Sequence, residues 1–232
     1  MKKLLFALML MGIILSAASE VLAVSHAAIS AKWERLNESI MRLAEQIAQN
    51  NKPAFETRLT KKERSYDDDY FGTGMTTAVF SRIWAKDKTI VSGWANADKN
   101  FHAEFIATTD PLMNFAGGIR VGANVRVLEK FFHAPLNEIR EKDVNGNYIH
   151  GNNIVYGGSE SDSDLWCVYI SYKNGVITEI NAMNKAWPGG FLVPFPSRVE
   201  AFYKKMRRQL GFPKSVTPWQ GWGFSYYYDL ER

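Results

Sequence analysis

The stretch LWCVYISYKNGVITEINAMN, residues 165–184, decides the fold. Residues 165–172 and 176–182 are both rich in aromatic and β-branched side chains, which favour strands. The dipeptide Asn174-Gly175 between them is typical of a two-residue hairpin turn, because both positions of the favoured turn require a positive φ. We therefore predict an antiparallel hairpin. Alternation then places Trp166, Val168 and Ile170 on one face and Cys167, Tyr169 and Ser171 on the other.

A glycine-rich entry and a short helix precede this hairpin. The string GGIRVGANVRVLEKFFHAP, residues 117–135, carries four apolar side chains at helical spacing. Asn124 is the best N-cap, because its side-chain oxygen can accept a backbone N–H that the first turn leaves unpaired. His133 stands where the helix end needs the left-handed conformation, which histidine tolerates. The four apolar side chains are Val125, Leu128, Phe131 and Phe132.

Strand-like runs fill the region 53–116, and a further strand is expected at residues 153–156. Within the first region, Val, Ile, Phe, Trp and Thr are concentrated between polar breaks. We predict antiparallel strands there at residues 76–84, 89–94 and 101–108.

An amphipathic helix is predicted over residues 24–52. Its apolar positions step by four and three residues, which makes one continuous stripe. The sequence Asn50-Asn51-Lys52-Pro53 ends the helix, because proline cannot continue the hydrogen-bond ladder. The helix either docks on its own domain or forms a short coiled coil, and the second alternative makes a homodimer one partner hypothesis. The stripe consists of Ile29, Trp33, Leu36, Ile40, Leu43 and Ile47.

The C-terminal region, residues 185–232, contains a predicted helix with a basic side. Ser197 and Glu200 have the spacing of a capping box, and Gly211 and Pro213 end the helix. The basic side of such a helix has two interpretations. It either contacts anionic lipid or an acidic partner, or it is simply exposed to solvent. Its basic residues are Lys204, Lys205, Arg207 and Arg208.

An aromatic strand follows that helix. Alternation puts four aromatic side chains on one face, where they either stack on glycan or a peptide or close the core. These residues are Trp222, Phe224, Tyr226 and Tyr228.

The first 23 residues have the pattern of a secretory signal peptide. Lys2 and Lys3 precede an apolar run over residues 4–15, which is too short for a membrane span of about 20 residues. We predict cleavage after Ala23, with Ala18 as the alternative, and hence an extracytoplasmic protein, periplasmic or secreted. Export and a formal charge of only +4 argue against nucleic-acid binding. The single cysteine, Cys167, is expected to be a buried thiol.

The sequence carries none of the common short motifs for catalysis or metal binding. The sequence contains no zinc helix, nucleophile elbow, phosphate loop or paired-cysteine site. Acidic runs at residues 67–69 and 143–147 lack the ligand pattern of a calcium loop. The acidic run at residues 159–164 is either a solvated hairpin tip or a weak calcium site. We therefore predict no catalytic residue, no metal and no cofactor.

The string at residues 117–135, with IVYGG, LWCVYISYKNG and VITEINAMN after it, resembles a small module of bacterial secreted proteins. Over residues 117–184 it is similar to the β-lactamase-inhibitor-like and outer-membrane-assembly-lipoprotein-like (SmpA/OmlA) group. The resemblance implies helices packed on one face of an antiparallel sheet and a noncatalytic protein-binding role. Two residues depart from the pattern, because Ala123 replaces the usual polar cap and His133 the usual glycine.

Together these features predict an α+β fold, with helices packed on one face of an antiparallel meander sheet and residues 53–232 as one composite unit. The leading hypothesis is an exported, noncatalytic protein-binding module of the bacterial cell envelope with an unknown protein partner. The contact surface is expected on the sheet face opposite the helices, with Tyr156, Trp166 or Tyr169 as anchors, because aromatic residues dominate hot spots. The alternatives are an envelope ligand binder, for glycan through the aromatic strand or anionic lipid through the basic helix, and a hydrolase with a dispersed site.

Overall fold

The structure is a computed structural model that describes residues 27–60, 78, 80–95, 101–140, 153–161, 164–184 and 197–213. A helix over residues 27–50 comes first within these ranges. The elements after it are β1 (Phe55–Arg58), β2 (Phe80–Lys86), β3 (Thr89–Ala95), β4 (Phe101–Thr108), the 3-10 turn η2 (Ala116–Gly118), α3 (Val127–Phe132), α4 (Leu136–Ile139), β5 (Ile154–Ser161), β6 (Asp164–Lys173), β7 (Val176–Asn184) and α5 (Ser197–Gln209).

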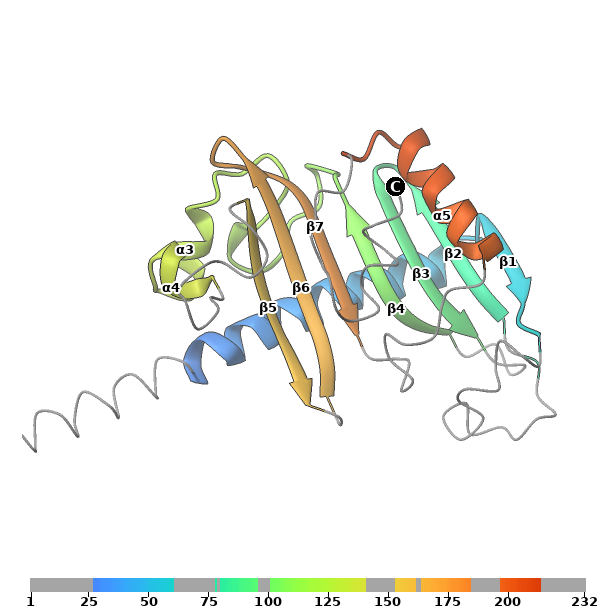
Figure 1. Cartoon of the computed structure of the whole chain (residues 1–232), viewed down its shortest axis with the longest axis horizontal. Coiled ribbons are helices and arrows are strands. Elements are labelled where there is room, and N and C mark those ends of the chain that lie inside the picture. The colour runs from blue at the N-terminus through green and yellow to red at the C-terminus, as the bar shows by residue number, and fades with distance from the viewer. Residues whose placement is uncertain are drawn as a thin grey trace, which may run out of the picture.

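The seven strands form one sheet in the order β1-β2-β3-β4-β7-β6-β5 (Figure 1). Every neighbouring pair is antiparallel, so the predicted α+β class with an antiparallel meander is confirmed. The pairing of β4 with β7 joins strands from the two halves of the chain in this single sheet.

The predicted hairpin and the predicted left-handed end of the helix are confirmed by the backbone. Asn174 and Gly175 have φ values of 52° and 74°, as the two-residue turn between β6 and β7 requires. His133 ends α3 in the left-handed conformation, with φ 54°. The predicted N-cap is wrong, because the N-cap of α3 is Arg126, which makes no side-chain cap hydrogen bond. Oδ1 of Asn124 instead accepts from the backbone N–H of Arg126 (3.0 Å) in the turn before the helix. Cys167 is buried, also as predicted, and forms no disulfide.

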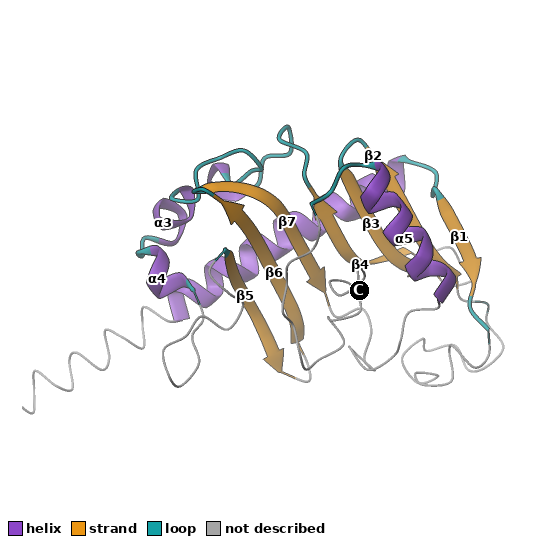
Figure 2. Ribbon diagram, turned by 45° about the horizontal axis from the view of Figure 1, so that its top comes forward, coloured by secondary structure: helices purple, strands orange, loops and turns teal. Residues whose placement is uncertain are grey.

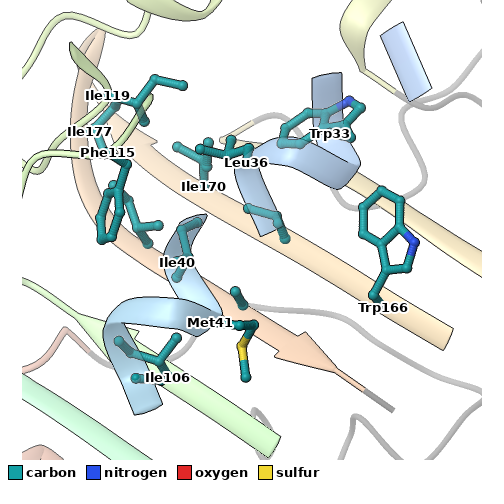
Figure 3. Close-up of a cluster of buried hydrophobic side chains, with 14 of the residues drawn as sticks. Trp33, Leu36, Ile40, Met41, Ile106, Phe115, Ile119, Trp166, Ile170 and Ile177 are labelled. Carbon is teal, nitrogen blue, oxygen red and sulfur yellow. The ribbon is translucent and has the colours of Figure 1, made fainter. Parts of the chain in front are cut away.

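The N-terminal helix packs its apolar stripe against one face of the sheet, which we call the first face (Figures 1 and 2). Trp33, Leu36 and Ile40 are buried there among strand residues such as Trp166 and Ile170 (Figure 3). The stripe therefore docks on its own sheet. Its side chains are not available for the coiled-coil homodimer that the sequence left open.

Two close contacts fix this helix on the sheet. The ring of Trp33 lies directly on the backbone of Gly157 in β5, where an added Cβ would be 2.1 Å from the ring. Asn37, buried within the helix face, donates through Nδ2 to the carbonyl oxygens of Cys167 (3.2 Å) and Met183 (3.1 Å). These two carbonyls belong to paired residues of β6 and β7, so the amide ties the helix to both of these strands.

Helix α5 lies on the opposite face, which we call the second face (Figures 1 and 2). Val199 and Tyr203 of α5 are buried against strand residues such as Ile83 and Phe105. The helix ends as predicted, because Gly211 has φ 71°. The N–H of Phe212 then donates to the carbonyl of Arg207 (2.9 Å), which satisfies an orphan carbonyl of the last turn.

Among the described residues, no helix is long and apolar enough to cross a membrane. The predicted signal peptide lies outside those residues, so it remains a prediction.

Candidate functional site

Three connections meet at one end of the sheet, which we call the loop end: residues 86–88, 109–126 and 173–176. Thr89 at the start of β3 pairs with Thr108 at the end of β4, which brings the first two connections together. The N–H of Thr109 donates to the carbonyl of Lys88 (2.9 Å). Asn124 forms a bridge with Val176, which joins the third connection to the second.

Leu112 is the most exposed large apolar side chain of the described residues, with 87% of its surface accessible. It sits in an ordered turn, because its N–H donates to Oδ1 of Asp110 (2.9 Å) and the N–H of Asp110 donates to Oγ1 of Thr108 (3.1 Å). The next residue, Met113, turns inward, and its sulfur accepts from Oγ1 of Thr89 (3.2 Å). The turn is therefore fixed to the sheet on one side and holds Leu112 outward.

Val176 is the second exposed apolar side chain at the loop end, at 40%. The long loop pairs with β7 beside it: the N–H of Gly122 donates to the carbonyl of Ile177 (2.8 Å), and the N–H of Ile177 donates to the carbonyl of Ala123 (2.9 Å). Gly122 has φ 85°, a conformation that side chains other than glycine rarely adopt. These bonds make the loop an ordered surface.

The exposed charge at the loop end is mostly positive. Asp87 is the one exposed acid within its three segments, because Asp110 is buried. Within the described part of the chain, none of the exposed basic side chains there forms an ion pair. Their positive potential is therefore not cancelled locally. The basic residues are Lys86, Lys88, Arg120, Arg126 and Lys173.

The aromatic anchors expected from the sequence do not form an exposed surface. Trp166 is 7% exposed and packs on the first face beneath the N-terminal helix. Tyr156 and Tyr169 are also buried, on the second face, with their rings 4.8 Å apart. None of the three therefore lies on an exposed sheet face as an anchor, contrary to the expectation from the sequence, because all three side chains are buried in the core.

The basic side of α5 is also smaller than predicted, because Arg207 is buried. Its guanidinium donates to both carboxylate oxygens of Glu179 (2.8 and 3.2 Å) and stacks over the ring of Phe212, 4.8 Å from the centroid. Burial raises the pKa of Tyr203 to about 12, so this hydroxyl stays protonated and accepts from Nη1 of Arg207 (3.4 Å). Lys205 and Arg208 are exposed, and Lys204 is half-buried.

The remaining predicted site residues lie outside the described residues. These are Trp222, Phe224, Tyr226 and Tyr228 of the aromatic strand. Among the residues that the structure describes, no group of three or more His, Cys, Asp or Glu could hold a metal ion.

Sequence reasoning missed Leu112, because one apolar residue in a turn has no periodicity to reveal it. The only signal was its place directly after Pro111 in a loop, where burial is not expected.

No family model matches the chain, and no curated protein or solved structure shows significant similarity to it. The resemblance over residues 117–184 therefore remains a prediction.

Proposed function

We propose that the chain is an exported, noncatalytic protein-binding module of the bacterial cell envelope, and that its loop end is the contact surface. The observation that carries this proposal is Leu112, which is 87% exposed although its turn is ordered by side-chain hydrogen bonds. An apolar side chain on a preorganised turn costs little backbone entropy on binding, so more of its contact energy contributes to affinity. The signal-like segment over residues 1–23 supports export.

The charge of the loop end supports an acidic partner. Its three segments carry five exposed basic side chains and one exposed acid, together with the exposed Leu112 and Val176. Complementary charge speeds association and suppresses wrong partners, while apolar side chains supply contact. We therefore propose a partner protein with an acidic rim around an apolar pocket.

The loop end offers several neighbouring segments to a partner. It extends from the β2–β3 turn to the β6–β7 turn, across strands β2, β3, β4, β7 and β6. Four inter-strand spacings amount to roughly 19 Å. A surface of that width can supply part of one side of a standard protein–protein interface, which buries about 800 Å² per partner.

The alternative of an anionic-lipid surface on α5 is less well supported. Arg207 is paired with Glu179 inside the protein, so it cannot contribute to an exposed basic face. The glycan alternative rests on the aromatic strand, which lies outside the described residues.

The test compares capture by three forms of the mature chain, residues 24–232, from solubilised envelope of its own host. Leu112→Asp places a carboxylate at the centre of the proposed surface, and Gln49→Asp places the same charge at an exposed position of the N-terminal helix. We expect one envelope protein to be captured by the unaltered chain and by Q49D and lost with L112D. Equal capture by L112D, or retention only by anionic vesicles, would contradict the proposal.

A further inference from the structure

The two edges of the seven-stranded sheet differ in how they are protected. The edge strand β1 has only four residues, and Arg198 of α5 reaches over it to donate to Oγ1 of Thr57 (2.8 Å) and to the carbonyl of Arg58 (3.0 Å). The other edge strand, β5, has eight residues and no proline, and it pairs with β6 residue for residue without a bulge. Short length, proline, bulges and covering elements are the devices that keep an edge from pairing with another chain. The first of these devices protects β1, together with Arg198, whereas β5 lacks the first three.

The hydrogen-bond phase of β5 identifies the main-chain groups that point away from the sheet. The N–H of Tyr172 donates to the carbonyl of Asn153 (2.9 Å), so residue 153 and every second residue after it bond to β6. Residues 154, 156, 158 and 160 therefore direct their N–H and C=O groups outward. Nε of Arg140 donates to the carbonyl of Ile154 (3.1 Å) from that outer side, which agrees with this phase.

The outer edge of β5 is open at Gly158. Helix α4 and the side chain of Arg140 flank the first residues of β5 (Figures 1 and 2). Gly158 lies further along the strand and is exposed. Within the described part of the chain, its outward N–H and C=O have no hydrogen-bond partner. Because glycine has no side chain, another strand can approach the main chain closely at this position.

The charges along this edge have opposite signs at its two ends. Arg140 and Lys173 are at the Ile154 end. The sequence places Glu160 and Asp162 at the other end of the strand and directly after it. An antiparallel second copy of β5 brings the acidic end of each copy opposite the basic end of the other, whereas a parallel copy brings like charges together. The charge pattern therefore favours a twofold-related copy of this chain over a parallel one.

We propose that β5 is a homodimerisation strand, in which two copies pair antiparallel about a twofold axis at Gly158 and join their sheets into one. Gly158 of each copy exchanges two main-chain hydrogen bonds with Gly158 of the other, and positions 156 and 160 of the two copies lie opposite each other. The remaining edge, β1, is short and covered by Arg198, so the assembly closes as a dimer and does not extend into a fibre.

This dimer differs from the coiled coil that the sequence left open, because the N-terminal helix takes no part in it. The twofold axis reverses the strand direction, so the loop ends of the two copies point in opposite directions and both stay accessible. The inference therefore does not rest on the proposed protein partner.

Sedimentation velocity and amide exchange on the mature chain, residues 24–232, test the dimer. The protein is studied from about 1 μM to about 1 mM, with a reducing agent that keeps Cys167 from forming an intermolecular disulfide. We expect the fraction of dimer to rise with concentration. In nuclear magnetic resonance, exchange of the Gly158 N–H should slow roughly tenfold or more over the same range, whereas that of the Leu112 N–H at the loop end should not change.

Two variants of Glu160 test the interface, and two controls accompany them. Glu160→Pro removes an outward N–H and leaves the bonds between β5 and β6 in place, so the dissociation constant of the dimer should rise about tenfold or more. Glu160→Lys puts a positive charge at the acidic end and should also weaken the dimer. Glu38→Lys makes the same charge change on the exposed side of the N-terminal helix and should leave it unchanged, as should Leu112→Asp.

The outcomes separate this proposal from its alternatives. If E160P does not fold, E160K decides together with the exchange of Gly158. A monomer at every concentration, or a dimer whose affinity is the same in both Glu160 variants, would overturn the proposal. Protection of the Gly158 N–H only after solubilised envelope is added would assign the edge to a strand of another protein and would overturn it as well.

Discussion

The carboxyl of Glu104 makes the stability of the protein depend on pH in a defined direction. It is 6% exposed, and burial raises its pKa from 4.5 to about 8. The folded state therefore holds this proton more tightly than the unfolded state. The contribution of Glu104 to stability is complete below pH 4.5, the pKa of this carboxyl in the unfolded state. This contribution is lost progressively as the pH rises toward 8 and does not change further above that value.

The magnitude follows from the difference between the two pKa values. Each unit is worth about 1.4 kcal/mol, so the cost of ionising Glu104 in the folded protein reaches roughly 3 kcal/mol at pH 7. Glu104→Gln removes the ionisation and keeps the size of the side chain. We therefore expect the free energy of unfolding of E104Q, relative to the unaltered chain, to increase by roughly 3 kcal/mol between pH 5 and pH 8.

Urea unfolding followed by tryptophan fluorescence at several pH values measures this difference. Glu38→Gln, at an exposed position, should show a difference that does not change with pH. A difference for E104Q that is equally flat from pH 5 to pH 8 would refute the reasoning, because it would mean that the folded state does not bind the proton more tightly. A stability difference that changed only around pH 4.5, the ordinary pKa of a glutamate carboxyl, would refute the reasoning equally.

Three further predictions concern packing, the buried ion pair and processing. Gly157→Ala should destabilise the protein by roughly 1–3 kcal/mol because the new methyl meets the ring of Trp33, and the cost should shrink in a Trp33→Ala background, as a double-mutant cycle would show. Arg207→Met should cost roughly 3–5 kcal/mol because it leaves the carboxylate of Glu179 buried without a counter-charge, and R207M combined with Glu179→Leu should recover much of this loss in thermal unfolding. N-terminal sequencing of the protein from its host should begin at Val24, and an intact Met1 would contradict the predicted export signal.

The local elements were predictable because their sequence periods are strong. The apolar stripe of the N-terminal helix and the Asn174-Gly175 turn require only neighbouring residues to be recognised, and β4 has the predicted bounds. β1 was not predicted as a strand of its own, because four residues at the sheet edge give too short an alternation. The pairing of β4 with β7 was not predictable either, because it joins residues more than 70 positions apart without a local signal.

The candidate sites were harder to predict because they depend on tertiary contacts. The alternation of side chains along β6 correctly placed Trp166 and Tyr169 on opposite faces of the sheet. It could not show that both of these side chains are buried. Arg207 was placed on a solvated basic face, whereas Glu179, 28 residues earlier, draws it into the interior. Nothing in the sequence around Glu104 indicates that this residue is buried.

Site-specific photocrosslinking in the native host tests the central claim, binding through the loop end, most directly. A photoreactive amino acid replaces Leu112 in one strain and Gln49, an exposed residue of the N-terminal helix, in another. Our account predicts a crosslink to a single envelope protein from position 112 and none from position 49. No protein adduct at position 112, or the same adducts from both positions, would contradict it.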